Sequence, residues 1–419
     1  MSSSSRDAGP HPPVICRGED PRLAGTYPAD GVQFSLKMVI RPITGHAAVF
    51  AACVLLFCGC AARARTASAP WSGNLQLASS VPLESAAAAD PALLDRVLFV
   101  PLRNGRLVSV AIDTGAIRWT IDLPTEPGLT AGEGLVFVAT ADALVAIGAD
   151  GSRRWSIPIP GGFSAPPIWN SGWLIASTKN GEVLGIRAQD GEVLWTARLP
   201  GAVAARPAFG VDRVFLPIED GQLVAVDVRS GQVLWQRRLG GRPGAPLAAA
   251  DRIFVGAADR WFYCLSAENG DRKWRWRHGG LITAAPAIDA RHVYVTGLNN
   301  ILRALDRHGG SQRWMQGLPL RPIGGPLVMD ELVVVAGIGG EIRTYRGWTG
   351  EPAGEFAAAG DLAVAPLLVP HAVPELTGLA LLIRSGELQF ARRPLGVEVT
   401  PLKEAFGVQV PLGAPPSPP

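Results

Sequence analysis

The side chains of this chain best suited to chemistry are one cysteine and four histidines in its long repetitive part. Cys264 is the only thiol there, and His278, His292, His308 and His371 are not at the spacing of zinc ligands. A cysteine nucleophile needs a histidine beside it as a base, and no histidine can be placed next to Cys264 from the sequence. The surrounding sequence RWFYCLSA predicts a strand that buries the thiol. We therefore assign no catalytic residue.

The acidic and glycine-rich segments do not form the pattern of a cofactor site. Asp220, Asp227, Asp251 and Asp259 lie on separate turns rather than in one calcium-binding loop. The pieces GGRPGAP and PIGGP are followed by strand-like sequence, whereas a phosphate-binding loop leads into a helix. We predict no cofactor and no metal, and interpret these pieces as connections.

The segment DRKWRWRHGG, residues 271 to 280, interleaves basic and aromatic side chains, as a groove for single-stranded nucleic acid does. The same alternation fits an outer strand that carries tryptophans on one face and basic side chains on the other, where the charges protect an exposed edge. The formal net charge of +3 gives no strong attraction to nucleic acid or anionic lipid. We expect an outer edge or a protein-contact surface, and no nucleic-acid partner.

Cys60 is a candidate for covalent modification. Lys37 and Arg41 precede the apolar run ITGHAAVFAACVLLFCGC, which ends at this cysteine. The order is that of a secretory signal, and the run is short for a membrane span. Its end resembles a bacterial lipoprotein signal, with FCG in front of the lipidated residue. We predict lipidation of Cys60, with a plain export signal or an anchor helix as the alternatives.

Behind these residues lies a regular repeat, in which a glycine is followed four residues later by a tryptophan. Successive tryptophans are 36, 40, 40, 39 and 40 residues apart, a constancy typical of repeat architectures. The 49 glycines and 36 prolines favour short strands joined by turns. The pairs are Gly115/Trp119, Gly151/Trp155, Gly191/Trp195, Gly231/Trp235, Gly270/Trp274 and Gly310/Trp314.

One repeat unit, ARPAFGVDRVFLPIEDGQLVAVDVRSGQVLWQRRLG, shows why the units must come together. In its second strand Leu223 and Ala225 point to one face while Val224 and Val226 point to the other. Both faces are apolar, so the sheet must be covered on both sides, which a ring of such sheets achieves. Trp235 is then expected to fill the wedge between neighbouring sheets. A ligand-stacking or saccharide-binding surface is the alternative, and recurrence after the same turn favours packing.

We predict an all-β fold, a β-propeller of eight four-stranded blades, with seven as the alternative. The seventh unit keeps Gly350 but has Gly354 at the tryptophan position, with Phe356 close by, and the eighth unit loses the marker. The segment NLQLASSVPLE, residues 74 to 84, could supply a strand that closes the ring. The predicted divisions are a mis-annotated extension before Met38 (1–37), a lipoprotein signal peptide (38–60), a linker with the possible closing strand (61–90), the propeller (91–403) and a proline-rich tail (404–419).

The pattern of alanine, any residue, aspartate, then glycine and tryptophan, seen in AVDVRSGQVLW and ALDRHGGSQRW, resembles the tryptophan-docking repeat of the pyrroloquinoline-quinone-type β-propellers. Arg187 and Ser266 replace the aspartate in two units. The resemblance implies that each tryptophan docks on a neighbouring blade. Quinoprotein dehydrogenases of this fold carry an adjacent pair of cysteines and a calcium site, neither of which this sequence shows, so the quinoprotein interpretation is an alternative only.

The lipoprotein signal, the length and the propeller together resemble the BamB family, scaffold lipoproteins of the outer-membrane β-barrel assembly machinery. This resemblance implies a non-enzymatic, monomeric scaffold. It would be lipid-anchored to the outer membrane, face the periplasm and bind an outer-membrane barrel insertase. A propeller that binds a cell-wall saccharide is a further alternative. No partner-binding residue can be assigned from the sequence.

Overall fold

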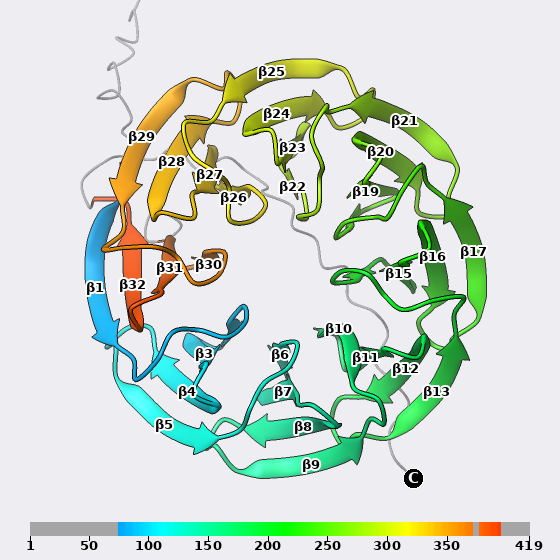
Figure 1. Ribbon diagram of the computed structural model, residues 1–419, viewed down its shortest axis with the longest axis vertical. Coiled ribbons are helices and arrows are strands. Elements are labelled where there is room, and N and C mark those ends of the chain that lie inside the picture. Colours follow the sequence, from blue (N-terminus) through cyan, green and yellow to red (C-terminus); the bar gives the residue numbers. More distant parts are fainter. Residues whose placement is uncertain (1–73, 372–376, 395–419) are drawn as a thin grey trace, which may run out of the picture. The chain divides into compact units, whose positions relative to one another are not determined.

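The described part of the chain forms thirty-two β-strands in eight four-stranded antiparallel sheets (Figure 1). The computed structural model describes residues 74–371 and 377–394. Within these ranges the structure contains strands and no helix, and hence no helix able to cross a membrane. Each sheet is one blade of a ring, so the predicted all-β, eight-bladed propeller is confirmed and the seven-bladed alternative is wrong.

Seven blades follow one another along the chain, each with its four strands in sequence order from the ring axis outward. Blades 1 to 4 are β2 (Ala92–Leu94), β3 (Val97–Pro101), β4 (Arg106–Ala111), β5 (Ile117–Asp122); β6 (Leu129–Gly132), β7 (Leu135–Ala139), β8 (Ala143–Gly148), β9 (Arg153–Pro158); β10 (Phe163–Asn170), β11 (Trp173–Thr178), β12 (Glu182–Arg187), β13 (Val193–Arg198); and β14 (Ala208–Phe209), β15 (Arg213–Pro217), β16 (Gln222–Asp227), β17 (Val233–Arg238). Blades 5 to 7 are β18 (Leu247–Ala249), β19 (Arg252–Gly256), β20 (Trp261–Ser266), β21 (Arg272–Arg277); β22 (Ala287–Ile288), β23 (His292–Gly297), β24 (Ile301–Asp306), β25 (Gln312–Gly317); and β26 (Leu327–Met329), β27 (Leu332–Ala336), β28 (Glu341–Arg346), β29 (Pro352–Ala357).

The eighth blade is built from both ends of the described chain. Its inner strands are β30 (Leu367–Val369), β31 (Gly378–Ile383) and β32 (Glu387–Arg392), and its outer strand is β1 (Gln76–Pro82). β1 pairs antiparallel with β32, beside which it lies in Figure 1. The ring is therefore closed by a strand from the segment 74 to 84. The other predicted divisions, which include residues 1–73, Cys60 and the tail, fall outside the described residues and stay predictions.

Eight clusters of buried apolar side chains hold the ring together, and each lies between two neighbouring blades. Leu223 and Ala225 pack against β19 and β20 of the following blade. Val224 and Val226 from the same strand pack against β11 and β12 of the preceding blade. The two-faced burial predicted from the sequence is confirmed, and it explains why a single unit is not a stable fold.

The six repeat tryptophans lie on the outer strands and reach across to the next blade. In five of them the indole Nε1 donates a hydrogen bond of 2.7–3.1 Å to a backbone carbonyl of that blade. The bonds run from Trp119 to Ala149, Trp155 to Ala188, Trp195 to Val228, Trp235 to Ala267 and Trp314 to Gly347. The Nε1 of Trp274 is buried and has no hydrogen-bond partner among the described residues.

The glycine of the repeat receives the tryptophan of the preceding blade, not that of its own. A Cβ added at Gly231 would lie 2.5 Å from Cε3 of Trp195, and one at Gly350 would lie 2.5 Å from Cδ2 of Trp314. Gly231 also has a φ of +72°, in the left-handed region that favours glycine. Within one motif, the glycine therefore contacts the preceding blade and the tryptophan contacts the following blade.

Each repeat tryptophan also needs a small residue beneath it on the adjacent strand of its own blade. A Cβ at Gly185, for example, would lie 2.0 Å from Cε2 of Trp195. This requirement explains the alanine of the repeat pattern and the place of the thiol. The residues opposite the six tryptophans are Ser109, Ala146, Gly185, Ala225, Cys264 and Ala304.

Two seams lack a docking tryptophan and are closed by other side chains. Between blades 7 and 8, Phe356 packs against a cluster that contains Leu379 and Leu381. Between blades 8 and 1, Val81 of β1 takes the place of the indole, since a Cβ at Gly115 would lie 2.9 Å from its Cγ2. The degenerate seventh and eighth repeats are therefore the ones next to the closure.

The turn before each repeat tryptophan is held by side-chain hydrogen bonds. In blade 4 the Asp227 carboxylate accepts bonds from the backbone N–H and the hydroxyl of Ser230. In blade 3 Arg187 occupies this position and forms ion pairs of 2.8 Å with Asp190 and 2.6 Å with Glu192. In this blade the acidic groups, Asp190 and Glu192, follow the basic residue in the turn. The turn is therefore still held by side-chain interactions although the aspartate of the repeat is replaced.

The seam glycines can be tested with a matched pair of substitutions. Gly231→Ala is expected to lower the free energy of unfolding by about 1–3 kcal/mol more than Gly134→Ala, because only the first methyl group collides with an indole. Gly134 has nearly the same φ, +74°, and no atom lies within 4 Å of its added Cβ. Both variants carry the same backbone penalty, and urea unfolding measures the difference. Equal losses would show that the contact with Trp195 adds nothing.

Candidate functional site

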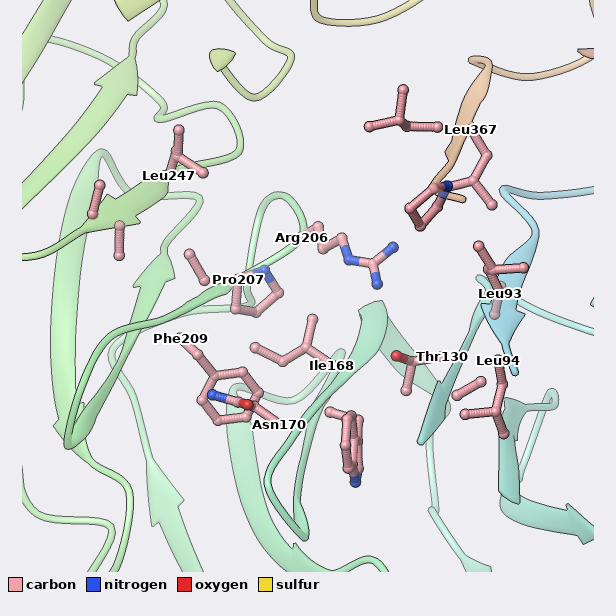
Figure 2. Close-up of a pocket in the computed structure, with 18 of the residues that line it drawn as sticks. Leu93, Leu94, Thr130, Ile168, Asn170, Arg206, Pro207, Phe209, Leu247 and Leu367 are labelled. Carbon is pink, nitrogen blue, oxygen red and sulfur yellow. The ribbon is translucent and has the colours of Figure 1, made fainter. Parts of the chain in front are cut away.

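A cavity of about 1250 Å³ lies at the centre of the ring, among the inner strands of the blades. Residues of β2, β6, β10, β14 and β18 line it, together with residues from blades 6 and 8. Leu93, Ile168, Phe209, Leu247 and Leu367 contribute apolar side chains to this lining (Figure 2). The cavity therefore offers a mainly apolar wall to a bound molecule.

Arg206 lies just before β14, and its guanidinium points into this cavity (Figure 2). Its side chain is exposed and forms part of the cavity lining. Desolvation lowers the pKa of Arg206, and the charge of Asp90 acts in the opposite direction. Among the described residues the guanidinium forms no hydrogen bond and no ion pair. The site thus contains a cation without a bonded counter-ion.

Asp90 is the acidic residue that interacts with Arg206 across the ring. It precedes β2 in blade 1, whereas Arg206 belongs to blade 4. Burial raises the pKa of the Asp90 carboxyl, and the charge of Arg206 lowers it by a smaller amount. The two charges attract each other without direct contact, so both remain available to a ligand.

The other two cations of the cavity lining are already bonded to protein. Arg96 forms a two-pronged ion pair with Asp113 and donates a hydrogen bond of 3.1 Å to the carbonyl of Pro370. Arg307 Nη1 donates a weak bond of 3.4 Å to the carbonyl of Asp289. Among the described residues that line the cavity, Arg206 is the cation best placed to bind an anion.

A second feature is an exposed aromatic cluster formed by Trp348, Arg291 and His292. Trp348 lies in the turn between β28 and β29 and is 63% exposed, the largest exposed fraction among the large apolar side chains described. The guanidinium carbon of Arg291 lies 4.7 Å from its ring centroid, and the His292 ring meets it edge-on at 5.6 Å. The cluster joins blades 6 and 7 and presents a cation and an indole to solvent.

Asp289 holds the base of this cluster. Its carboxylate accepts hydrogen bonds from the backbone N–H groups of Arg291 and His292 and from the hydroxyl of Tyr294. Burial works to raise the pKa of Asp289, but the hydrogen bonds from His292 and Tyr294 outweigh it and lower the pKa to about 2. The turn that carries Arg291 is therefore fixed at neutral pH.

The basic and aromatic segment 271–280 forms the outer strand of blade 5, as expected. Along β21 the two tryptophans are half-buried, whereas Lys273, Arg275 and Arg277 are exposed. The guanidinium carbon of Arg275 lies 4.2 Å from the centroid of the Trp261 ring, so one of the cations contacts an aromatic side chain of its own blade.

The thiol and the histidines are dispersed over the ring. Cys264 is fully buried and lies opposite Trp274, and burial raises the pKa of its thiol to about 11. His278 is buried in blade 5, and His292 is buried in the aromatic cluster. Within residues 74–371 and 377–394 no three His, Cys, Asp or Glu side chains lie close enough to hold a metal ion. Among the described residues Cys264 is the one cysteine, so they hold no adjacent pair of cysteines of the kind that the resemblance to quinoproteins implies.

A family model described as "Outer membrane protein assembly factor BamB" matches residues 103–245 and 237–361 of this chain. These two stretches cover more than half of the 419 residues. The chain belongs to the BamB family. A curated member, the outer membrane protein assembly factor BamB of Kangiella koreensis, is 28% identical over 114 residues, which are 27% of this chain and 28% of that protein. The match thus spans about a quarter of the relative's length.

Solved structures show how widely the fold of this BamB-family chain is used. BamB from Moraxella catarrhalis superposes with a TM-score of 0.64 at 17% identity, over 76% of this chain and 100% of that chain. The quinohemoprotein alcohol dehydrogenase from Comamonas testosteroni superposes with a TM-score of 0.63 at 14% identity, over 80% of this chain and 78% of that chain. At these identities the likeness is one of fold alone.

Sequence reasoning did not find Arg206 of the cavity or its acidic neighbour Asp90 in this BamB-family chain, although a signal was present. In four blades the residue before the proline of the inner strand is small: Ala245, Ala285, Gly325 and Ala365. In blades 1 and 4 the corresponding residues are Asp90 and Arg206. An alignment of the repeats on this proline, rather than on the tryptophan, separates the two charged positions from the rest.

Proposed function

We propose that this protein is a lipid-anchored scaffold at the periplasmic face of the outer membrane that takes part in the assembly of outer-membrane β-barrel proteins. Membership of a family described as outer membrane protein assembly factors supports the proposal. In this proposal Cys60 carries the lipid anchor, and the partner is a barrel insertase. The role is one of protein binding rather than of catalysis.

The aromatic cluster is the surface that we assign to the protein partner. Tryptophan and arginine are the side chains most enriched at the energetic centres of protein interfaces. Trp348 is 63% exposed in the described structure, and Arg291 covers one side of its ring. A large apolar ring held in a fixed orientation loses little conformational freedom on binding, which favours a stable contact.

Crosslinking in the native membrane, followed by identification of the captured proteins, tests this function. The full-length protein is expected to capture a barrel-assembly complex, and Trp348→Ala is expected to reduce its recovery about tenfold or more. Met315→Ala is the matched control, because Met315 is 48% exposed on the outer strand of blade 6 and lies outside the cluster. A capture that lacks every barrel-assembly component would refute the proposed function.

The anchor is tested in the same membranes. Cys60→Ala is expected to release the protein into the soluble fraction and to abolish incorporation of a labelled fatty acid. Cys264→Ala removes the buried thiol and is expected to retain both the label and the membrane. Retention of the label in the Cys60 variant would place the lipid elsewhere.

A further inference from the structure

The central cavity has the properties of a binding site for a small molecule. Such sites usually have volumes of about 300–1,000 Å³, a mainly apolar wall and a few polar groups that fix the ligand. The cavity here measures about 1250 Å³, and leucine, isoleucine and phenylalanine side chains from several blades line it. Its size and lining therefore suit a ligand with an extended apolar part.

Arg206 supplies the polar group. Its side chain is exposed to the cavity, and no described residue forms an ion pair or hydrogen bond with it. An anion bound at short range would accept charge-assisted hydrogen bonds from this guanidinium, which are stronger than hydrogen bonds between neutral groups. The guanidinium points into the cavity, where it can donate two parallel hydrogen bonds to a carboxylate or a phosphate (Figure 2).

The position of Arg206 in the ring is one where other blades pack small residues closely together. A Cβ added at Gly325 would lie 2.1 Å from the carbonyl oxygen of Ala285, and one at Gly128 would lie 3.1 Å from Pro166. A long charged side chain here is a departure from the repeat. Packing within the ring does not require it, because the corresponding position is small or apolar in every other blade except blade 1, where it is Asp90.

Asp90 limits the charge that the cavity can accept. Its carboxylate attracts Arg206 and repels a bound anion, so the net charge contributed by the two residues is near zero. A polyanion would therefore be disfavoured, whereas a single anionic group can bind the guanidinium directly, since Asp90 does not contact it.

We propose that the central cavity binds an amphiphile with one anionic head group, which Arg206 holds while the apolar chain lies against the leucine-rich wall. The shared chemistry of the head is that of a fatty acid carboxylate or of a single phosphate. The inference is independent of the scaffold function, since the aromatic cluster and the cavity use different residues.

Calorimetry with the full-length protein in lipid nanodiscs, with empty nanodiscs subtracted, tests the proposal. The probes are decanoate, decyl phosphate and decanol, which share one chain length and differ in the head group. Decanoate or decyl phosphate is expected to bind once per protein, and the tighter of the two identifies the head group. Arg206→Gln is expected to weaken that binding about tenfold or more, while Arg206→Lys retains most of it. Decanol is expected to bind more weakly and to be insensitive to both variants.

Two further variants distinguish a charge effect from a general loss of structure. Asp90→Asn is expected to tighten binding of the anion, because it removes the competing carboxylate. Arg118→Gln, on the exposed face of β5, is expected to leave binding unchanged. Equal binding of decanoate by the wild type and by Arg206→Gln would overturn the proposal, as would equal affinities for decanoate and decanol.

A peptide is the main competing occupant. The competing experiment uses an apolar peptide with a free carboxyl terminus and the same peptide with an amidated terminus. If the free peptide displaces decanoate at a concentration lower than decanoate needs to occupy the cavity, and the amidated peptide does not displace it, the assignment of an amphiphile is wrong. Arg206→Gln is also expected to leave the recovery of the barrel-assembly complex unchanged, so a failure of the cavity proposal is distinguishable from a failure of the scaffold proposal.

Discussion

Replacement of Trp314 by alanine is expected to lower the free energy of unfolding by about 3–5 kcal/mol. Trp314 is the most deeply buried of the six repeat tryptophans, with 8% of its surface exposed. Its Nε1 donates a bond of 2.8 Å to the carbonyl of Gly347, and its ring lies 5.7 Å from that of Tyr294 and against Gly350. Alanine would leave a cavity between blades 6 and 7, and the carbonyl of Gly347 would keep only the hydrogen bond of 3.0 Å from the Tyr294 hydroxyl.

Trp348→Ala is the matched control for this experiment. The same atoms are removed only 34 residues further along the chain, from a side chain that is 63% exposed. Its effect on stability is expected to stay within about 0.5 kcal/mol. Urea unfolding gives both free energies, provided that the slope of the free energy of unfolding against urea concentration is the same in the wild type and the variants. Similar losses for the two variants would contradict the role of the seam in stability.

The contrast between these two tryptophans shows what the sequence can predict. Trp314 belongs to a series with a constant period, and the physics of a two-faced apolar strand requires that its unit pack against copies of itself. The ring, the number of blades and the closing strand follow from that pattern. Trp348 does not follow the Gly-x-x-x-Trp spacing, and the sequence alone does not reveal its exposure or the approach of Arg291 from the neighbouring blade.

The charged groups near the cavity could not be predicted from the sequence, for a related reason. Asp90 and Arg206 are 116 residues apart, and only the closure of the ring brings their charges close enough to interact. The spacing of the repeat also does not reveal which neighbouring blade each residue of the motif contacts. The glycine and the tryptophan of one motif serve different seams, because each glycine receives the indole of the preceding blade.

His278 is the second residue for which a large effect is expected, and its environment was not foreseen. The side chain is 1% exposed, and neither ring nitrogen makes a hydrogen bond of normal geometry with the described residues. A Cβ at Gly297 would lie 2.6 Å from its Cε1, so that glycine makes room for the ring. Desolvation, aided by the charge of Arg303, lowers the pKa of His278 to about 4, although backbone groups of Val295 and Ile301 act in the opposite direction.

This shift makes stability depend on pH. In the unfolded chain His278 takes up a proton near its ordinary pKa of 6.5, whereas in the folded protein it does so only near pH 4. The stability that the neutral buried ring contributes is fully present above pH 6.5 and is lost as the pH falls through 4. The loss from this residue is expected to be about 3 kcal/mol between neutral pH and pH 4.

Urea unfolding as a function of pH isolates the contribution of His278 when it is compared between variants. His278→Phe keeps a buried ring that cannot be protonated, so its stability is expected to fall less than that of the wild type by about 3 kcal/mol over this range. His308→Phe replaces an exposed histidine in the next blade and is expected to follow the wild-type curve. Other carboxyl groups change both curves equally, and Asp289, with a pKa of about 2, acts only at lower pH. If His278→Phe followed the wild-type curve between pH 7 and pH 4, the buried ring would not be the group that takes up the proton, and Gly297 would be making room for a side chain with no effect on acid stability.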